Sequence, residues 1–314
     1  MSIALLILGL VVLLISGELL VKGAVGLATK FHVSPLIIGL TIVSFGTSAP
    51  ELIVCIEGSL AGLNEIVVGN IVGSNIANLA LVLGLTCLVF PIAIDKNSIR
   101  VDWPLMMVAS VLFAWFAFDQ VITQVEAAIL FFVLLSYLGY LFFFSKKQKA
   151  DIVSEASEMS KDADKKSNTQ LLLYIIPACF GLYFGANWFL EGATDLAKIF
   201  GVSDHVIGVT VVAFGTSVPE LVTSMVAAFR KQTNISIGNI IGSNIFNLLG
   251  VLGVTGMIKA IPVSNTMLSV DIYWMLFVSV LLFPLMILGK KLNWWKGIVL
   301  FSIYVAYILL QFNF

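Results

Sequence analysis

The feature that most constrains this fold is a segment that occurs twice, 169 residues apart. The first copy consists of GLTIVSFGTSAPEL at Gly39–Leu52 and GNIVGSNIANL at Gly69–Leu79. The second copy consists of GVTVVAFGTSVPEL at Gly208–Leu221 and GNIIGSNIFNL at Gly238–Leu248. About half of the paired positions from Ile38 to Thr86 are identical. We therefore expect two halves that share one fold.

The chain is apolar along its whole length. Hydrophobic residues make up 60% of it and charged residues 11%, against roughly 45–50% and about 25% in soluble domains. Because a helix needs about 20 apolar residues to cross a bilayer, we expect an all-α membrane protein with ten transmembrane helices. The predicted helices lie at residues 2–29, 34–61, 65–92, 101–118, 124–145, 171–199, 204–229, 234–260, 267–289 and 294–312. The first ten residues lack the basic start of a signal peptide, so we expect the first helix to be retained.

Residues 146–170 form the long polar stretch between the halves, with mixed charge and no aromatic residue. This composition predicts a solvated linker. It separates a first five-helix repeat at 1–145 from a second at 171–314. Lysine and arginine concentrate in the linker and in the loops on its side of the membrane, so the positive-inside rule places the linker in the cytoplasm and both termini outside. The cytoplasmic membrane of a prokaryote is the expected location.

Five helices per half is an odd number, so the second half must enter the membrane from the opposite side. Matching residues of such inverted repeats meet near the midplane, an arrangement typical of secondary transporters. Glu51 and Glu220 are matched in this way. A purely structural role for two packed acids is the alternative. A charge at the centre of a membrane helix costs at least ~2.5–3.5 kcal/mol on insertion scales, and its occurrence in both halves beside helix breakers favours a functional role.

A glycine and a proline flank two hydroxyl groups in each GTSxPE segment. Proline inside a helix removes one backbone hydrogen bond and clashes with the carbonyl four residues earlier, so Pro50 frees the carbonyl of Gly46. Pro219 does the same for Gly215. We therefore expect the second and seventh helices to be broken at membrane depth, where irregular backbone must be buried in protein or line a wet cavity. The adjacent hydroxyls belong to Thr47, Ser48, Thr216 and Ser217.

The GNxxGSNxxN segments place a hydroxyl and an amide on one face of the third and eighth helices. Ser74 and Asn78 lie four residues apart, and so share a helix face. Ser243 and Asn247 repeat the pattern. We expect these two helices to be broken around the same ion site at the membrane midplane. Glycines spaced by four are typical of close helix packing, and they are Gly69, Gly73, Gly238 and Gly242.

Carboxylates, amides, hydroxyls and freed carbonyls are all hard oxygen donors, and the set contains no imidazole or thiolate. It suits Ca²⁺, which takes roughly 6–8 oxygens, rather than zinc or copper. Two carboxylates neutralise one Ca²⁺, sub-sites with one carboxylate suit Na⁺, and protonation of both acids would empty the site. The expected partners are therefore these ions and the lipid bilayer. A net charge of −1 gives no indication of a nucleic-acid partner, and no organic cofactor is expected.

The paired GTSxPEL and GNxxGSNxxN segments resemble the two alpha-repeats of the calcium/cation antiporter superfamily, in its sodium–calcium exchanger branch. The resemblance implies that Glu51 and Glu220 share Ca²⁺. It also implies that the first and sixth helices slide across the others to alternate access. The implied hydroxyl ligands are those of Thr47, Ser48, Ser74, Thr216, Ser217 and Ser243, and the implied carbonyl ligands are those of Ser44 and Ala213.

One position departs from part of that family. Several exchangers carry an aspartate where this chain has Asn247, opposite an asparagine that matches Asn78. The missing acid leaves Na⁺ and H⁺ open as counter-ions for Ca²⁺, although Pro50 and Pro219 disfavour the proton-coupled branch. A cation channel or a membrane enzyme is the alternative from another class. No Ser-His, Cys-His or HExxH arrangement is visible in the sequence, which disfavours an enzyme.

Overall fold

The computed structural model describes residues 2–145, 167–201 and 215–311. In the first half the elements are α1 (Ser2–Phe31), α2 (Pro35–Ile38), η1 (Gly39–Val43), α3 (Ser44–Leu60), α4 (Asn64–Ile76), η2 (Ala77–Val82), α5 (Leu83–Val89), β1 (Ile92–Ala93), η3 (Ser98–Asp102), α6 (Trp103–Phe116), η4 (Ala117–Asp119), β2 (Val121–Ile122) and α7 (Gln124–Ser145). In the second half they are α9 (Asn168–Ile199), α12 (Val218–Phe229), α13 (Thr233–Ile245), η6 (Phe246–Val251), α14 (Leu252–Ile258), β3 (Ile261–Pro262), η7 (Met267–Asp271), α15 (Ile272–Ile287), η8 (Leu288–Lys290), β4 (Lys291–Leu292) and α16 (Trp294–Gln311).

The described ranges contain nine helical runs that are long and apolar enough to cross a membrane, and α12 as a shorter apolar helix. Each of the nine begins and ends within three residues of its predicted bounds. The seventh predicted helix, at 204–229, falls partly outside the described residues, since its described part begins at Gly215. The fold is the expected all-helical membrane architecture.

The interruptions in the membrane helices take the form of π-helical segments, whose turns are wider than those of an α-helix. These are η1 in the second helix, η2 in the third and η6 in the eighth. The break predicted at Gly46 and Pro50 is wrong, because Pro50 lies inside α3, which remains helical from Ser44 to Leu60, and the π-helical segment η1 precedes it. In the second half, Thr216 and Ser217 form a turn, and Pro219 lies in the first turn of α12. A proline there breaks no helical hydrogen bond, so the two prolines of the repeat have different backbone surroundings.

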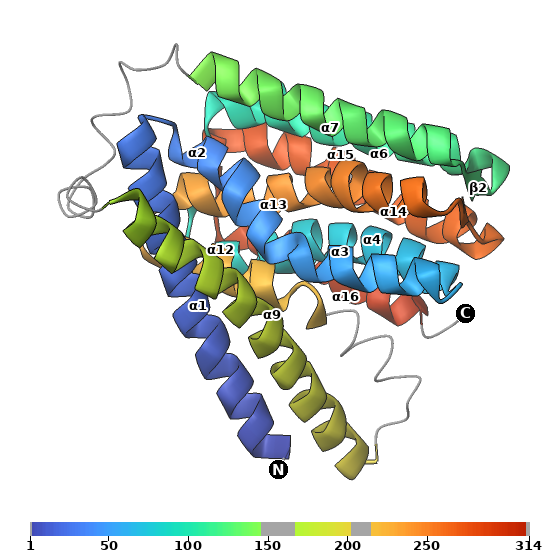
Figure 1. Cartoon of the computed structure of the whole chain (residues 1–314), viewed down its shortest axis with the longest axis horizontal. Helices are drawn as coiled ribbons and strands as arrows, with labels where there is room; N and C mark the ends of the chain where they lie inside the picture. The colour runs from blue at the N-terminus through green and yellow to red at the C-terminus, as the bar shows by residue number, and fades with distance from the viewer. Residues whose placement is uncertain (1, 146–166, 202–214, 312–314) are drawn as a thin grey trace.

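The first helices of the two halves, α1 and α9, lie side by side and cross the remaining helices obliquely (Figure 1). They run in opposite directions. Ser2 at the start of α1 donates a hydrogen bond to Asp195 near the end of α9, at 3.1 Å. Gly26, toward the end of α1, contacts Leu171 at the start of α9. Because equivalent helices are antiparallel, the halves have inverted topology.

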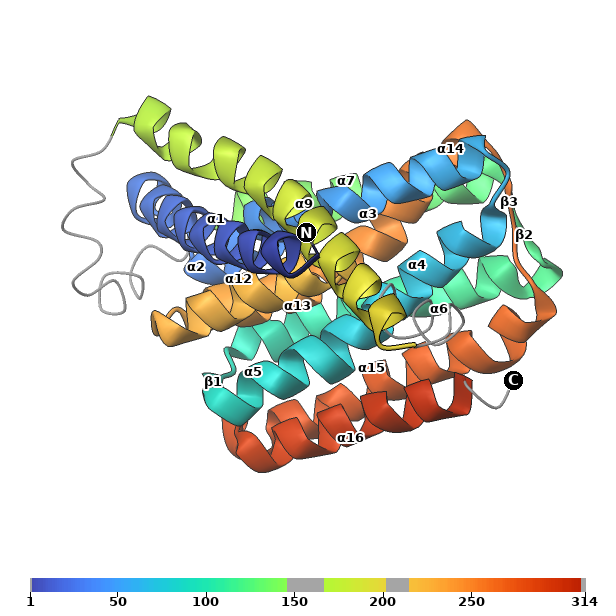
Figure 2. The same ribbon diagram turned by 90° about the horizontal axis from the view of Figure 1, so that it is seen from below.

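Two short antiparallel sheets join the halves and lead to the same conclusion. Strand β1, after the third helix, pairs with β4, before the tenth. Strand β2, before the fifth helix, pairs with β3, after the eighth. The two sheets lie at opposite ends of the helix bundle (Figure 2). Loops at the same ordinal position in the two halves therefore lie at opposite ends, as inversion requires.

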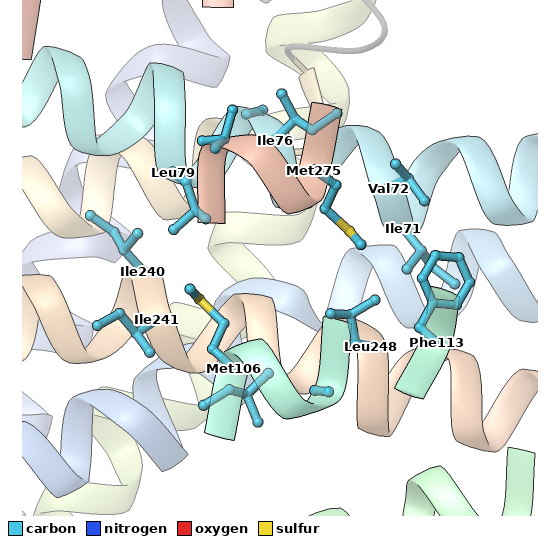
Figure 3. Close-up of a cluster of buried hydrophobic side chains, with 14 of the residues drawn as sticks. Ile71, Val72, Ile76, Leu79, Met106, Phe113, Ile240, Ile241, Leu248 and Met275 are labelled. Carbon is cyan, nitrogen blue, oxygen red and sulfur yellow. The ribbon is translucent and has the colours of Figure 1, made fainter. Parts of the chain in front are cut away.

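The hydrophobic core contains residues that the repeat relates to one another (Figure 3). They come from α4, η2 and α6 in the first half and from α13, η6 and α15 in the second. Four labelled pairs are separated by 169 positions, namely Ile71 with Ile240, Val72 with Ile241, Leu79 with Leu248, and Met106 with Met275. Matching residues of the halves thus share one buried cluster, which holds the ion-site helices in place.

Two of the four motif glycines allow the eighth helix to approach the second. A Cβ atom built on Gly242 would lie 2.8 Å from the Cα of Leu40 and from the Oγ of Ser44, and one on Gly238 would lie 2.6 Å from the Leu36 carbonyl. The packing role is therefore confirmed for Gly238 and Gly242. A Cβ atom built on Gly73 would have no neighbour within 4 Å in the described part of the chain. The repeat counterpart of the segment that packs on Gly242 belongs to residues 202–214, which lie outside that part.

We expect Gly242→Ala to lower the thermal stability of the protein and its ion binding, because the new methyl group meets backbone that cannot move without separating helices. Overpacking of this kind typically costs about 1–3 kcal/mol. Thermal unfolding of the detergent-solubilised protein measures the effect. Gly139→Ala on α7 is the control, because a Cβ atom there would have no neighbour within 4 Å among the described residues, and it should not lower the melting temperature. Equal melting temperatures for wild type and Gly242→Ala would contradict the close approach.

Candidate functional site

The two carboxylates of the repeat lie together in the interior. Glu51, on α3, and Glu220, in the first turn of α12, are both 0% exposed. The Ser48 hydroxyl donates a 2.8 Å hydrogen bond to Glu220 Oε1, and Ser243 donates to the same oxygen at 3.3 Å. Ser48 lies three residues before Glu51 on α3, so this bond places the Glu220 carboxylate beside the helical turn that carries Glu51.

Thr47 is the centre of a group of oxygens that spans the two halves. Its Oγ1 lies 3.2 Å from the backbone oxygen of Ser44, 3.1 Å from Oδ1 of Asn239 and 3.3 Å from Oγ of Ser243. All four residues are buried. The second helix of the chain, in the first half, and the eighth helix, in the second half, therefore contribute adjoining oxygens.

The repeat-related group consists of Ser74, Thr216 and Asn70. Ser74 Oγ lies 3.3 Å from Thr216 Oγ1 and 3.4 Å from Oδ1 of Asn70. Ser74 corresponds to Ser243, Thr216 to Thr47 and Asn70 to Asn239 in the repeat. The site thus has two similar oxygen groups, which the repeat relates to each other.

The amides of Asn78 and Asn247 are buried in the π-helical segments η2 and η6. Asn247 Nδ2 lies 3.4 Å from Oδ1 of Asn75. A wider helical turn changes the direction in which these side chains project, which is a common use of π segments at functional sites.

Several buried oxygens of the site have no hydrogen-bond donor within the described ranges. They are both carboxylate oxygens of Glu51, Oε2 of Glu220, Oδ1 of Asn78, Oδ1 of Asn247 and Oγ of Ser217. Burial of a polar atom without a partner costs about 1–3 kcal/mol, and more for a charged group. A set of inward oxygens without donors is therefore suited to a cation. The described residues contain no cluster of three or more His, Cys, Asp and Glu side chains, so a cation between the two carboxylates would take its other ligands from neutral oxygens.

Hydrogen bonds link one group of predicted residues across the halves, namely Ser44, Thr47, Ser48, Glu220 and Ser243, and a second pair, Ser74 and Thr216. Glu51, Asn78, Ser217 and Asn247 are buried and have no hydrogen bond to these residues in the described part of the chain. Ala213 lies outside the described residues. Asn70 and Asn239 were not predicted to contribute, although each occupies the same place in the GNxxGSN segment, four residues before a serine of the site. That spacing puts each asparagine on the same helix face as its serine, so the sequence did contain a signal for both residues.

Other acids of the membrane helices lie away from this group. Glu18, on α1, forms an ion pair with Arg230 through both carboxylate oxygens, at 2.5 and 3.0 Å, and lies 3.3 Å from Lys22. Glu57 is exposed at the end of α3. Cys55 is a free thiol, and it accepts a hydrogen bond from Asn70 at 3.3 Å.

An inverted pair of helical repeats with two buried acids among oxygen donors defines a secondary cation transporter. The family model of the sodium/calcium exchanger protein matches residues 1–146 and 170–313. The chain therefore belongs to the sodium/calcium exchanger family. It is a multi-pass membrane cation exchanger and not an enzyme.

Similar proteins cover nearly the whole chain. The sodium/calcium exchanger MaX1 of Methanosarcina acetivorans is 32% identical over 340 residues, with 98% of this chain and 97% of MaX1 covered. Inner membrane protein YrbG of Escherichia coli is 34% identical over 283 residues, covering 88% and 86%. A structure of the sodium–calcium exchanger NCX_Mj has a TM-score of 0.81 and 31% identity, covering 98% of each chain. Other structures of NCX_Mj were soaked with Na⁺ and Ca²⁺ or Sr²⁺.

Proposed function

We propose that this protein exchanges Na⁺ for Ca²⁺ across the membrane, at a site shared by Glu51 and Glu220. The observation that carries the proposal is that both carboxylates are fully buried and that Ser48, one helical turn before Glu51, bonds to Glu220 of the other half. Two negative charges match one Ca²⁺, and carboxylate, hydroxyl and carbonyl oxygens are the ligands that Ca²⁺ prefers.

Ca²⁺ is held between the two glutamates in this proposal, and oxygens from both halves complete its coordination. Na⁺ occupies the flanking groups, in which each ion meets neutral oxygens and at most one carboxylate. Since the two ions compete for the same glutamates, binding of Na⁺ displaces Ca²⁺. The proposed ligands are Glu51, Glu220, Thr47, Ser48, Thr216, Ser217, Ser74, Asn78, Ser243 and Asn247, with the carbonyls of Ser44 and Ala213.

We infer that α1 and α9 move as a pair across the other helices to open the site to either side. Their oblique placement against the bundle supports this assignment (Figure 1). The repeats at 1–145 and 171–314 then act as two inverted units joined by a cytoplasmic linker at 146–170, with both termini outside. The lysine and arginine bias of the loops supports that orientation.

Exchange of Ca²⁺ or another cation for H⁺ is the second candidate. The observation that favours it is an amide at Asn247 in place of a third acid, because fewer fixed charges are available for several Na⁺ ions. Protonation of Glu51 and Glu220 would then release the divalent ion. Apart from the counter-ion, the exchange would be the same as in the first proposal.

Flux of ⁴⁵Ca²⁺ into proteoliposomes tests the proposal, with Na⁺ and pH gradients imposed separately. We expect Ca²⁺ uptake when the vesicles are loaded with Na⁺ and diluted into Na⁺-free buffer. Uptake that requires a pH gradient and ignores Na⁺ would establish the H⁺ alternative. Ca²⁺ movement down its own gradient without any counter-ion would indicate a channel and contradict both.

Asn247→Asp should change the dependence of Ca²⁺ flux on Na⁺. Asn247 is buried and its Oδ1 has no donor within the described ranges, so a carboxylate there adds negative charge to the site. We expect a lower half-saturating Na⁺ concentration, since Coulombic attraction at ~4 Å amounts to about 4 kcal/mol at an effective dielectric constant of 20 before desolvation is subtracted. An unchanged Na⁺ dependence in a folded variant would show that this position does not limit Na⁺ coupling.

A further inference from the structure

We propose that Asn239 is a positioning residue that orients the Thr47 hydroxyl toward a bound cation, and that Asn70 does the same less firmly for Ser74. This inference rests on the proposed ion site. Neither asparagine is among the proposed ligands. Both act from behind the hydroxyls, through their amide oxygens.

A hydroxyl group has one proton and two lone pairs. It binds a cation only through a lone pair, so its proton must point to an acceptor elsewhere. Asn239 Oδ1 lies 3.1 Å from Thr47 Oγ1. Asparagine's amide oxygen can only accept, so in this contact Thr47 is the donor. The Ser44 carbonyl at 3.2 Å is a second acceptor for the same proton, and with either acceptor a Thr47 lone pair can face the ion.

The Asn239 side chain is itself held by two contacts of its amide nitrogen. It is 0% exposed, and its Nδ2 donates to Ser224 Oγ at 3.0 Å and reaches the backbone oxygen of Glu220 at 3.5 Å. The Glu220 carbonyl can only accept, so this contact favours the amide nitrogen on its side and the amide oxygen toward Thr47. The same residue thus connects α13, α12 and, through Thr47, α3 of the other half. Outer contacts of this kind orient ligands and commonly change metal affinity about 10–100-fold when removed.

The first half does not repeat this arrangement, since in the described contacts Asn70 bonds to Ser74 of its own helix and not to Thr216, the counterpart of Thr47. Asn70 Oδ1 accepts from Ser74 at 3.4 Å, but its Nδ2 faces the thiol of Cys55, where the repeat has Ser224 in the second half. Sulfur is a weak acceptor, and Asn70 is only half-buried. The two oxygen groups are therefore similar in composition and unequal in how firmly they are held.

Equilibrium binding of ⁴⁵Ca²⁺ to the purified full-length protein tests this inference. We expect Asn239→Leu to raise the dissociation constant for Ca²⁺ about tenfold, and Asn70→Leu to raise it less. Asn244→Leu is the matched control, because Asn244 is also buried on α13 but donates only to the Ile240 carbonyl of its own helix in the described contacts. Its dissociation constant should stay within about twofold of wild type.

A double-mutant cycle distinguishes positioning from a general structural effect. If Asn239 acts through the Thr47 hydroxyl, Asn239→Leu adds little to the effect of Thr47→Val, because the oriented group is already gone. Additive effects, or an unchanged dissociation constant in Asn239→Leu, would overturn the inference. Where leucine prevents folding, Asn239→Ala removes the same acceptor without added bulk. Wild-type protein that binds neither Ca²⁺ nor Na⁺ would instead contradict the proposed function on which the inference rests.

Discussion

Glu51→Gln and Glu220→Gln are each expected to abolish Ca²⁺ uptake in proteoliposomes while leaving the protein folded. Glutamine keeps the size of the side chain and removes its charge. At ~4 Å and an effective dielectric constant of 20, one unit-charge pair contributes about 4 kcal/mol. Losing even that much corresponds to roughly a thousandfold weaker binding, and the double charge of Ca²⁺ increases the loss.

The apo protein should tolerate either change. Glu51 has no hydrogen-bond donor on its carboxylate oxygens among the described residues, so glutamine breaks no hydrogen bond seen there. In Glu220→Gln the amide oxygen still accepts from Ser48. Thermal unfolding without ions should therefore remain close to wild type. Glu57→Gln, at an exposed acid on the same helix as Glu51, is the matched control and should transport normally. Wild-type flux in either site variant would refute the assignment of the glutamates.

Lys296→Met is expected to cause the largest loss of stability. Lys296 is 2% exposed, and its ammonium group donates to the carbonyls of Leu285 at 2.7 Å and Lys291 at 2.6 Å, and also to that of Leu288. Leu285 lies in the last turn of α15, where a helix leaves its carbonyls without internal partners, whereas Leu288 lies in η8 and Lys291 in β4. The ammonium group therefore joins the end of α15 to the segment that follows it. Methionine preserves the apolar stem and removes all three donors.

Each carbonyl left without a donor lowers the free energy of unfolding by about 1–3 kcal/mol. Part of this loss is offset, because the methionine variant no longer buries a charge. We expect a net loss of about 3 kcal/mol, which lowers the melting temperature by about 5 °C or more. Fluorescence-detected thermal unfolding in detergent measures the shift. Lys290→Met, at an exposed neighbouring lysine, should have a small effect. Equal melting temperatures for the two variants would show that the ammonium contacts do not stabilise the end of α15.

The duplicated segment made most of this fold predictable. Hydrophobic length placed the helices to within a few residues, and an odd helix number in each half required the inversion that the antiparallel α1 and α9 display. Glu51 and Glu220 could be paired from the repeat alone. The inversion follows from the odd number of helices in each half, so its prediction does not depend on side-chain packing.

The differences between the halves could not be predicted from the repeat, because a repeat describes only what is shared. Pro50 is accommodated within a continuous α3, whereas Pro219 begins a helix. Asn239 and Asn70 have the same motif position and different neighbours, a serine and a thiol. Lys296 contributes to the positive charge of its loop region, and it also caps a helix inside the protein. Each of these outcomes depends on contacts between distant segments.

Direct Ca²⁺ binding to the purified protein tests the shared-glutamate site most directly. Isothermal titration should give about one Ca²⁺ per chain, as two carboxylates neutralise one divalent ion, and added Na⁺ should displace it. The double variant Glu51→Gln/Glu220→Gln should bind no Ca²⁺ in the same range. Na⁺-sensitive Ca²⁺ binding that survives in the double variant would contradict the account.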